Sequence, residues 1–410
     1  MRGLPGFGGV VFDRLRRAAK REGAGGRSDY PRGEKSRFLD SAGLPVIGQS
    51  CAARNDREIP WLRSFRESDS RSAVEQNQSK ERSSLSVLVV GGAGYIGSHA
   101  ARVLRRNGYE VIIYDNLSRG HVFLAEGFEL IVADIADRAQ LKRAMTRVDS
   151  VMHFAAHSQV GESVQNPRIY FQNNDELGLV LLNCALDAGV RRFIFSSTCA
   201  VYGTPDRMPI TEDTPRHPVN PYGTSKLFFE HALEAYDRAY GLRYMSLRYF
   251  NAAGADESGE IGELHFPESH LIPNALKAIT GERGELELFG DDYPTPDGTC
   301  IRDYIHVNDL AEAHVLALKH LESGKNSAAL NLGTGVGCSV KEVITTTESV
   351  TGKKVPRRLG PRRAGDPPTL VADPARAQAA LQWKAKRSLR EIVETAWRWE
   401  TGGRRKAHRA

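Results

Sequence analysis

The 410-residue sequence predicts an α/β fold, in which helices cover both faces of a parallel sheet and a smaller mixed α/β lobe follows. Two observations predict this arrangement. Short apolar segments that are typical of buried strands alternate with helical segments as far as about residue 250. From about residue 255 the elements become shorter, and Pro, Gly and charged loops increase. Because such sheets bind ligands beyond the carboxyl ends of their strands, functional residues are expected at those ends.

The first predicted strand, residues 87–90, runs into a glycine-rich turn that opens a helix, with the spacing Gly91-x-x-Gly94-x-x-Gly97. The first glycine permits a tight turn, the second lets a pyrophosphate approach the backbone, and the third lets the helix lie close to the strand. The N-terminus of the helix offers unpaired N–H groups to phosphates. On its own the pattern is weak, since many glycine turns bind nothing. In this context it indicates a Rossmann-type, doubly wound, dinucleotide-binding sheet.

A carboxylate follows the second predicted strand, residues 110–114. Asp115 lies about 20 residues beyond the glycine turn, where a carboxylate can accept hydrogen bonds from the adenosine ribose. Such a carboxylate would repel a 2′-phosphate, which favours NAD over NADP. The alternative is a simple turn at Asp115-Asn116. Later strands are predicted at residues 128–132, 151–154, 193–195 and 244–248, and their carboxyl ends should meet Asp115 in one cleft.

The remaining elements and the domain boundaries follow from the same patterns. Helices are expected at residues 137–145, 167–189, 222–240, 271–279, 307–320, 339–350 and 388–397, and lobe strands at 286–289 and 329–332. The predicted domains are a disordered basic extension at 1–84, a Rossmann domain at 85–255, a lobe at 256–401 interleaved with it, and a basic, frayed tail at 402–410.

Composition excludes several classes of protein. Residues 1–84 hold 17 Lys and Arg against 11 Asp and Glu, so the formal net charge of +6 lies entirely in the extension. A nucleic-acid partner is therefore not implied. No stretch approaches the ~20 apolar residues of a membrane span, so no membrane association is expected. The 5 cysteines are odd in number and widely spaced, which favours a reduced, cytoplasmic protein without structural disulfides or a bound metal.

The strongest catalytic signal is a tyrosine and a lysine four residues apart. Of 13 tyrosines, only Tyr222 has a lysine at this spacing, Lys226, and a helix would place both on one face. An ordinary tyrosine has a pKa of ~10, but a nearby ammonium and an oxidised nicotinamide would lower it enough to make a base. Thr198, at the end of the fifth strand, can pass a proton between Tyr222 and a substrate hydroxyl. The alternatives are a surface Tyr–Lys pair and a hydroxyl that caps the strand end.

Together these motifs mark a known family. The chain resembles the extended short-chain dehydrogenases/reductases, and within them the UDP-glucose 4-epimerases, over roughly residues 85–400. The supporting stretches are Gly91–His99, Tyr114–Leu117, His153–Ala156, Val160–Val164, Phe195–Thr198, Pro221–Lys226, Leu247–Asn251, Phe289–Thr299, Arg302–Leu310 and Pro361–Asp366.

The resemblance implies roles for individual residues. Tyr222 would be the base, Thr198 the proton shuttle, and Lys226 the group that tunes Tyr222 and binds the nicotinamide ribose. Residues implied to bind NAD are Gly91, Gly94, Tyr95, Ile96, Gly97, Asp115, Asn116, Asp134, Ile135, Phe154, Ala155, Ala156, Asn173, Tyr222, Lys226 and Tyr249. Residues implied to bind a UDP-sugar are Thr198, Asn251, Leu271, Phe289, Arg302, Arg363 and Asp366. The family is often homodimeric, through the helices near 162–188 and 222–240.

The implied reaction is 4-epimerisation of UDP-glucose and UDP-galactose through a 4-keto sugar, with hydride passing to bound NAD and back. Leu370, four residues after Asp366, leaves room for UDP-GlcNAc and UDP-GalNAc or for the pentoses UDP-xylose and UDP-arabinose as alternative substrates. A nucleotide-sugar 4,6-dehydratase typically has Asp-Glu after the shuttle threonine, where Cys199-Ala200 stands here. A non-catalytic NAD-sensing protein commonly loses the Tyr–Lys pair. Asp175-Glu176 departs from a more neutral family stretch, and the sequence offers no account of it.

Overall fold

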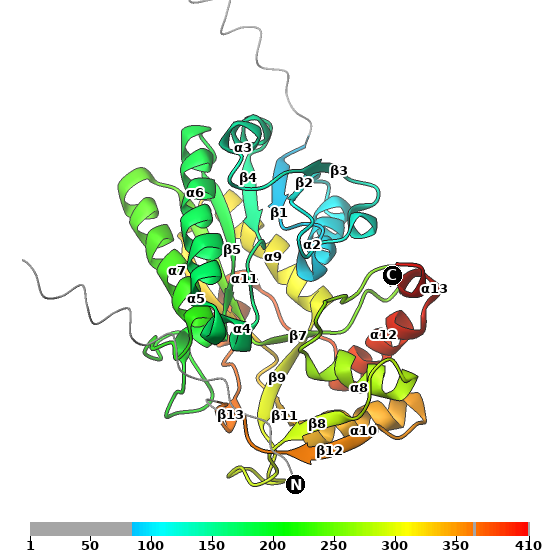
Figure 1. Cartoon of the computed structure of the whole chain (residues 1–410). Coiled ribbons are helices and arrows are strands. Elements are labelled where there is room, and N and C mark those ends of the chain that lie inside the picture. Colours follow the sequence, from blue (N-terminus) through cyan, green and yellow to red (C-terminus); the bar gives the residue numbers. More distant parts are fainter. Residues whose placement is uncertain (1–83, 364–365, 409–410) are drawn as a thin grey trace, which may run out of the picture. The chain divides into compact units, whose positions relative to one another are not determined.

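The computed structural model of the chain describes residues 84–363 and 366–408. The extension predicted at residues 1–84 therefore lies, up to residue 83, outside the described residues. The described part contains one large sheet and, beyond one end of it, a lobe of short strands and helices (Figure 1).

The large sheet has seven strands in the order β10-β6-β5-β4-β1-β2-β3, and every pair in it is parallel. The strands are β1 (Ser86–Val90), β2 (Glu110–Asp115), β3 (Glu129–Val132), β4 (Ser150–His153), β5 (Arg192–Thr198), β6 (Arg243–Tyr249) and β10 (Ala328–Leu332). The chain builds outwards from β1 to β3 and then returns to β4 on the other side of β1. This reversal places a ligand crevice beyond the carboxyl ends of β1 and β4, and it confirms the predicted doubly wound α/β fold.

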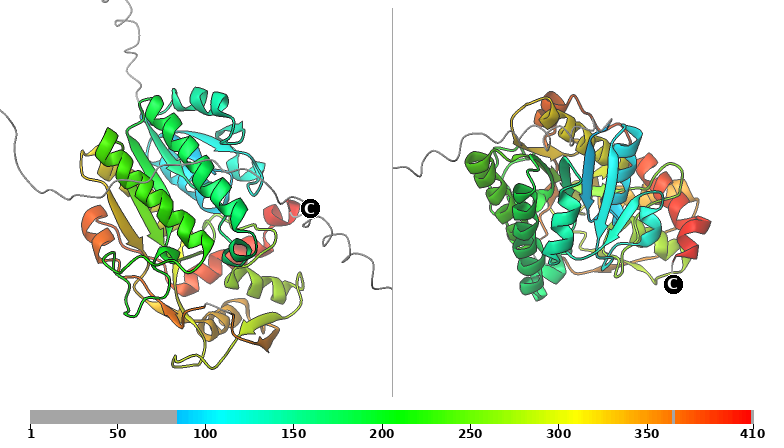
Figure 2. Two further views of the ribbon diagram at one scale, coloured as in Figure 1. Left: turned by 60° about the vertical axis from the view of Figure 1, so that its left-hand side comes forward. Right: turned by 90° about the horizontal axis from the view of Figure 1, so that it is seen from above.

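Helices cover both faces of this sheet. On one face lie α2 (Tyr95–Arg106), α9 (Val307–Glu322) and α11 (Ala375–Leu381), and on the other α3 (Arg138–Met145), α6 (Leu177–Asp187) and α7 (Pro221–Tyr240). Alternate residues of β1 enter different cores, since Val87 and Val89 pack with α2 whereas Leu88 and Val90 pack with α3 and α6. Figures 1 and 2 show α6 and α7 side by side on their face of the sheet. A strand buried on both faces reads as a continuous apolar run, as β1 does.

The lobe contains two small sheets and three longer helices. Its strands are β7 (Asn251–Ala253), β8 (Leu286–Phe289), β9 (Ile301–His306), β11 (Gly337–Ser339), β12 (Arg357–Gly360) and β13 (Thr369–Leu370). Its helices are α8 (Leu271–Thr280), α10 (Val340–Thr351), α12 (Leu389–Thr401) and the short α13 (Gly403–Ala407). β9 is central, because β7, β11 and β13 all pair with it, while β8 pairs with β12. Three elements beyond residue 255, α9, β10 and α11, pack in or on the large sheet rather than in the lobe.

The helix predicted at residues 167–189 is interrupted, so that prediction was wrong in one respect. It consists of α5 (Pro167–Tyr170), a π-helical turn η3 (Phe171–Glu176) and α6, preceded by α4 (Val160–Gln165). The other short turns are η2 (Val122–Ala125) and η4 (Cys199–Tyr202). π-helical turns inside longer helices frequently occur at functional sites, since the wider turn redirects side chains. η3 carries Asp175, a buried acidic residue.

The prediction of a frayed tail at residues 402–410 was also wrong, because the described part of this segment forms the helix α13. Arg405 in this helix is 1% exposed, and its Nη2 atom lies 2.9 Å from carboxylate oxygens of both Glu282 and Glu400. Burial raises the pKa of Glu400 to about 7, against the effect of Arg405. A buried guanidinium with two carboxylates therefore fastens the end of the chain to the lobe.

Arg405→Ala is expected to destabilise the protein by about 3–5 kcal/mol, because it leaves two carboxylates without their buried counter-charge. Urea unfolding followed by circular dichroism measures the loss. Lys406→Ala, in the exposed neighbouring position of α13, is the matched control and should change stability by less than about 0.5 kcal/mol. Equal stability of the two variants would contradict the role given to Arg405.

Candidate active site

The glycine turn after β1 brings three segments of backbone into close approach. Gly91 has φ +79°, and a Cβ atom there would lie 2.4 Å from the Ala155 nitrogen. A Cβ atom on Gly97 would lie 2.3 Å from the carbonyl oxygen of Gly91. Gly94 is the N-cap of α2 and provides no side-chain cap to its first N–H groups. The turn therefore presents uncapped N–H groups over a surface without side chains, which fits a pyrophosphate.

Carboxylates stand at the ends of β2 and β3, beside this turn. Asp115 is buried, and its two oxygens accept hydrogen bonds from the backbone N–H groups of Ala93, at 2.9 Å, and Leu117, at 2.8 Å. Burial raises the pKa of Asp115 although both hydrogen bonds lower it. Each oxygen retains a lone pair for a ribose hydroxyl. Asn116 donates through Nδ2 to Asp134 Oδ2 at 2.7 Å, which brings these two predicted residues together.

The ends of β4 and β6 contribute two aromatic side chains, Phe154 and Tyr249. Phe154 donates its N–H to the carbonyl of Val90 at 2.7 Å, so it follows β4 directly beside β1. The rings of Phe154 and Tyr249 lie 4.9 and 5.8 Å from the ring of His314 on α9. Burial lowers the pKa of His314 to about 4, so this imidazole is neutral. The sequence did not indicate His314 as a site residue, because no local pattern distinguishes a histidine that packs beside a site from any other buried histidine in a helix.

Tyr222 and Lys226 lie in the first two turns of α7, opposite the end of β5. Asn220 caps the helix by accepting a hydrogen bond from the Gly223 N–H at 2.8 Å. A Cβ atom on Gly223 would lie 2.5 Å from the carbonyl oxygen of Ala200, so the helix start is pressed against η4. This contact brings the Tyr222 hydroxyl into a hydrogen bond with the Thr198 side chain. The predicted base and the predicted shuttle are therefore neighbours.

Lys226 is 3% exposed and makes two contacts with β5. Its Nζ atom donates to the carbonyl of Ser196 at 2.8 Å and lies 4.7 Å from the centre of the Phe195 ring. Burial lowers its pKa to about 7, although Asp175 and Glu230 act in the opposite direction. The buried ammonium thus depends on the negative groups around it.

Burial controls the acidity of Tyr222 in the protein alone. We predict a lowered pKa for this phenol when both Lys226 and an oxidised nicotinamide lie beside it; in the protein alone, burial raises its pKa to about 12, although the hydrogen bond with Thr198 lowers it. Desolvation of the phenolate therefore dominates the pKa of Tyr222 in the protein alone. A further positive charge beside the phenol is required before Tyr222 can act as a base near neutral pH.

Two carboxylates face Lys226 from different elements. Glu230, one turn further along α7, is paired with Arg248 at 2.6 Å and also accepts a hydrogen bond from Ser197 at 2.5 Å. Asp175, on η3, is buried, and its Oδ1 atom makes no hydrogen bond within the described residues. Burial raises the pKa of Asp175 to about 7, while Lys226 lowers it. Asp175 is therefore the carboxylate that is left to balance the ammonium, which accounts for the unexplained acid in the sequence.

Apart from Thr198, which ends β5, the predicted sugar-nucleotide residues belong to the lobe, and four of them form two pairs. Arg302 lies on β9, with Nη2 3.7 Å from Asp366 Oδ1, and Nη1 donates to the carbonyl of Pro367 at 2.8 Å. The guanidinium of Arg363 lies 4.5 Å from the centre of the Phe289 ring. The two remaining residues of this group, Asn251 and Leu271, begin β7 and α8.

The lobe meets the catalytic residues at η4. Leu370 pairs with Arg302 between β13 and β9, and it packs in one apolar cluster with Cys199 and Tyr202. Burial raises the pKa of the Cys199 thiol to about 12, while nearby Arg302 lowers it. Cys199 in turn affects Tyr222. The lobe residues Arg302 and Leu370 therefore lie in the same region as Thr198 and Tyr222.

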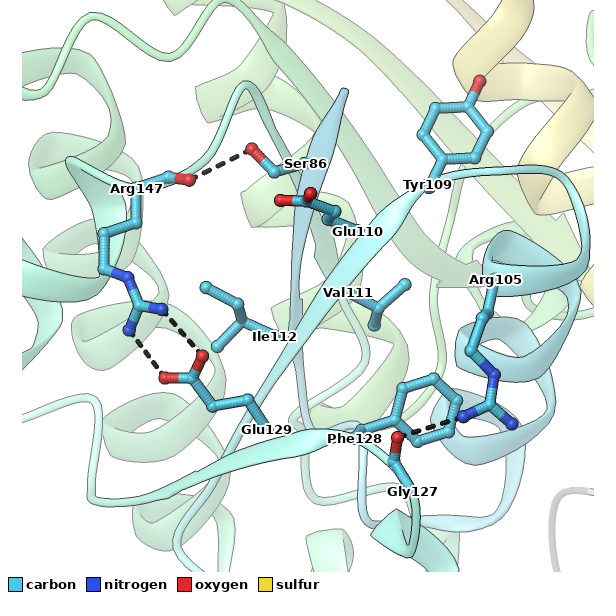
Figure 3. A pocket seen from close by; sticks show the side chains of 10 residues that line it. All are labelled: Ser86, Arg105, Tyr109, Glu110, Val111, Ile112, Gly127, Phe128, Glu129 and Arg147. Carbon is cyan, nitrogen blue, oxygen red and sulfur yellow. Dashed lines mark hydrogen bonds and ion pairs between the residues drawn. The ribbon is translucent and has the colours of Figure 1, made fainter. Parts of the chain in front are cut away.

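A separate cavity of about 450 Å³ opens at the other end of β1 and β2 (Figure 3). Three of its four charged side chains bind each other or the backbone. Arg147 pairs with Glu129 at 2.6 Å, and Arg105 donates to the carbonyl of Gly127 at 3.0 Å. The cavity lies at the amino ends of the strands, away from the glycine turn, and it contains none of the predicted site residues.

Comparison with known proteins agrees with this geometry. The model of the NAD dependent epimerase/dehydratase family matches residues 87–333. The UDP-glucose 4-epimerase of Halalkalibacterium halodurans is 49% identical over 318 residues, which cover 77% of this chain and 95% of that protein.

Two solved structures are similar over almost their whole length. The UDP-glucose 4-epimerase of Brucella ovis, in complex with NAD, is 50% identical with a TM-score of 0.75, covering 77% of this chain and 98% of that one. The enzyme of Stenotrophomonas maltophila, with bound NAD and formylated UDP-arabinopyranose, is 42% identical with a TM-score of 0.76, covering 80% and 100%. The chain belongs to the NAD dependent epimerase/dehydratase family, among the extended short-chain dehydrogenases/reductases that include the UDP-glucose 4-epimerases.

Proposed function

We propose that this chain is an NAD-dependent UDP-glucose 4-epimerase, an isomerase that interconverts UDP-glucose and UDP-galactose. The observation that carries the proposal is the hydrogen-bonded pair of Thr198 and Tyr222 with Lys226 on the same helix, at the carboxyl end of β5. This chain covers almost the whole length of the relatives that are named as UDP-glucose 4-epimerases.

The residues around the glycine turn fit NAD. Gly91, Gly94 and Gly97 would hold the pyrophosphate, and Asp115 the adenosine ribose. Bound NAD supplies the hydride acceptor and donor for C4 of the sugar. Its oxidised nicotinamide also carries the positive charge that Tyr222 lacks in the protein alone, because burial holds the pKa of that phenol at about 12.

The side chains of the site have separate tasks in the reaction. Tyr222, as phenolate, takes the proton from the 4-hydroxyl of the sugar through Thr198 and later returns it. Lys226 stabilises the phenolate by its positive charge. Arg302 and Arg363 suit the diphosphate, which they would hold while the keto sugar turns and presents its other face. Strong contacts to the nucleotide and weak contacts to the sugar are what such a rotation requires.

Substrates other than hexoses fit the same site. Leu370 is an apolar side chain of moderate size beside Arg302, which leaves space for an N-acetyl group or for a pentose. We propose UDP-GlcNAc, UDP-GalNAc, UDP-xylose and UDP-arabinose as further candidates. A 4,6-dehydratase is disfavoured, because the thiol of Cys199, with a pKa of about 12, stays neutral where that reaction needs an acid and a base.

Incubation with UDP-galactose distinguishes the three candidate functions. UDP-glucose as product supports the epimerase. A 4-keto-6-deoxy sugar nucleotide would identify a dehydratase instead, and no product would identify an NAD-sensing protein. A panel of UDP-hexoses, UDP-N-acetylhexosamines and UDP-pentoses then ranks the substrates by kcat/KM.

We also propose that the enzyme is a cytoplasmic homodimer. Five large apolar side chains are exposed on elements that contact one another, α4, η3 and α7: Val160, Val164, Phe171, Phe228 and Tyr240. Exposed apolar side chains on neighbouring elements are typical of subunit interfaces. The four cysteines within the described residues are free, which suits a reducing compartment. Among the described helices, none combines the length and apolar character that crossing a bilayer requires.

Tyr222→Phe is expected to reduce kcat by about 10²–10⁴-fold, because the variant keeps the ring but loses the proton-transfer group. NAD should remain bound, as measured by the coenzyme released on denaturation. Tyr236→Phe, further along the same helix with its hydroxyl on Asn183, is the control and should keep full activity. Full activity of Tyr222→Phe would exclude this tyrosine as the base.

As pH rises, kcat of the Asp175→Asn variant is expected to begin to fall at a lower pH than kcat of the wild type. The other groups around Lys226 are Glu230, which Arg248 already neutralises, and His153, whose pKa burial lowers to about 3. Without Asp175 the pKa of Lys226 falls further below about 7, so the ammonium that the phenolate needs is lost earlier as pH rises. The pH profile of kcat measures this shift. Exposed Glu176→Gln is the control, and coincident profiles of the two variants would contradict the prediction.

Val164→Glu with Phe228→Glu is expected to give a monomer, because burying two carboxylates at the proposed interface costs more than the apolar contacts return. Light scattering after gel filtration measures the mass. Val336→Glu, at an exposed apolar position in the lobe, should leave the dimer intact. A wild-type protein that is already monomeric would refute the proposed assembly.

A further inference from the structure

The segment between β7 and α8 gathers four potential metal ligands within eight residues. They are Glu263, His265, Glu268 and His270, and one ligand atom from each lies within 4.8 Å of the others. The two carboxylates form the inner side of the cluster, with side chains that are only 4% and 5% exposed. The two imidazoles form the outer side and are 30% and 48% exposed. The cluster is thus closed towards the protein and open towards solvent.

The contacts within this cluster centre on Glu263. Its Oε1 atom lies 3.0 Å from Nδ1 of His265 and is in short contact with Nδ1 of His270. The same Nδ1 atom of His270 lies 3.4 Å from Oε1 of Glu268. Oε1 of Glu263 thus contacts both histidines, and Nδ1 of His270 contacts both glutamates. The four side chains therefore direct their polar atoms towards one another.

Glu268 is the group that these contacts leave incomplete. Its Oε2 atom is buried and accepts no hydrogen bond from any of the residues that the structure describes. Nζ of Lys277 forms an ion pair with this atom at 3.7 Å, beyond hydrogen-bonding distance. The Oε1 atom already accepts hydrogen bonds from the N–H groups of Ser269 and His270, so Oε2 is the oxygen of Glu268 that can still coordinate an ion.

We propose that Glu263, His265, Glu268 and His270 bind one divalent transition-metal ion, with zinc the best match. Two imidazole nitrogens and two carboxylate oxygens make the mixed, four-membered ligand set that zinc accepts. Magnesium and calcium prefer oxygen ligands alone, so the histidines select against them. The ion binds the deprotonated Nδ1 atoms, and the protons that those nitrogens carry are released to solvent.

Local charge explains how the cluster folds with or without the ion. Without metal, protonated histidine beside Glu263 and the ammonium of Lys277 balance the two carboxylates. With metal, two positive charges of the ion replace the protons. Because the ion displaces protons from the histidines, metal binding competes with protons and strengthens as pH rises.

The metal would tie together the glycine turn and the lobe. The His265 ring lies 6.2 Å from the ring of Tyr95, on the first turn of α2. Between the ligands, the carbonyls of Phe266 and Pro267 accept hydrogen bonds from Arg119, at 2.9 Å, and Gln159, at 3.2 Å. α8 follows His270 directly. The proposed role of the ion is therefore to hold this connecting segment rigid, outside the chemistry at Tyr222.

The test titrates zinc chloride into the full-length protein after chelation, using calorimetry in two buffers that differ in ionisation enthalpy. We expect one zinc per chain by elemental analysis, release of protons, and a higher unfolding temperature. Cobalt substitution should give a tetrahedral spectrum without the charge-transfer bands of thiolate ligands, which excludes binding at cysteines.

The variant His265→Ala with Glu268→Gln removes two ligands but keeps the short contact between Glu263 and His270. The glutamine is close in size to the glutamate and keeps a side-chain oxygen that can accept a hydrogen bond. Its zinc affinity should fall by at least about 100-fold, with an unchanged unfolding temperature in chelator. The matched control is His231→Ala with Glu234→Gln, an exposed pair 3.3 Å apart on α7, which should bind zinc like the wild type. Equal affinity in both variants, or no zinc bound by the wild type, would overturn the proposal.

Discussion

The ammonium of Lys226 is buried at the end of β5, and the catalytic region is arranged around the cost of keeping it there. A charge in this position needs hydrogen-bond acceptors and counter-charges. The carbonyl of Ser196 and the ring of Phe195 supply contacts, and Asp175 and Glu230 supply negative charge. Arg248 already neutralises Glu230, so the π-helical turn that carries Asp175 has a direct electrostatic purpose.

The same burial sets the condition under which Tyr222 works. A buried phenol resists ionisation, and its pKa of about 12 leaves it protonated in the protein alone. The base is therefore formed only when a second cation joins Lys226. In the proposed mechanism, the reactivity of Tyr222 therefore depends on an oxidised coenzyme, and electrostatics links proton removal to hydride removal from the sugar. A tyrosine with a permanently low pKa would have no such link.

The lobe contributes its residues through β9. Because β7, β11 and β13 all pair with this strand, Arg302, Asn251 and Leu370 share one small sheet although the chain separates them widely. Leu370 and the η4 residues Cys199 and Tyr202 pack in one apolar cluster, and η4 directly follows Thr198 at the end of β5. The small sheet of the lobe is therefore in contact with the segment that follows Thr198.

The sequence by itself determined the features whose signals are local: the apolar run and glycine spacing around Gly91, the helix that carries Tyr222 and Lys226, and the alternation of strands and helices that predicts a parallel sheet. It did not determine the order of the strands, and it assigned to the lobe the strand at 329–332, which belongs to the large sheet. It could not determine the break in the helix at residues 171–176, the pairing of Arg405 in the last helix, or the neutral His314 between two aromatic rings. Nor could it show that burial raises the pKa of Tyr222 to about 12 in the protein alone. The spacing of residues along a helix shows which charged groups lie near a titratable side chain. The degree of burial decides how strongly the loss of solvent disfavours the charged form of that side chain. Burial depends on contacts between residues far apart in the chain, and only the tertiary structure specifies those.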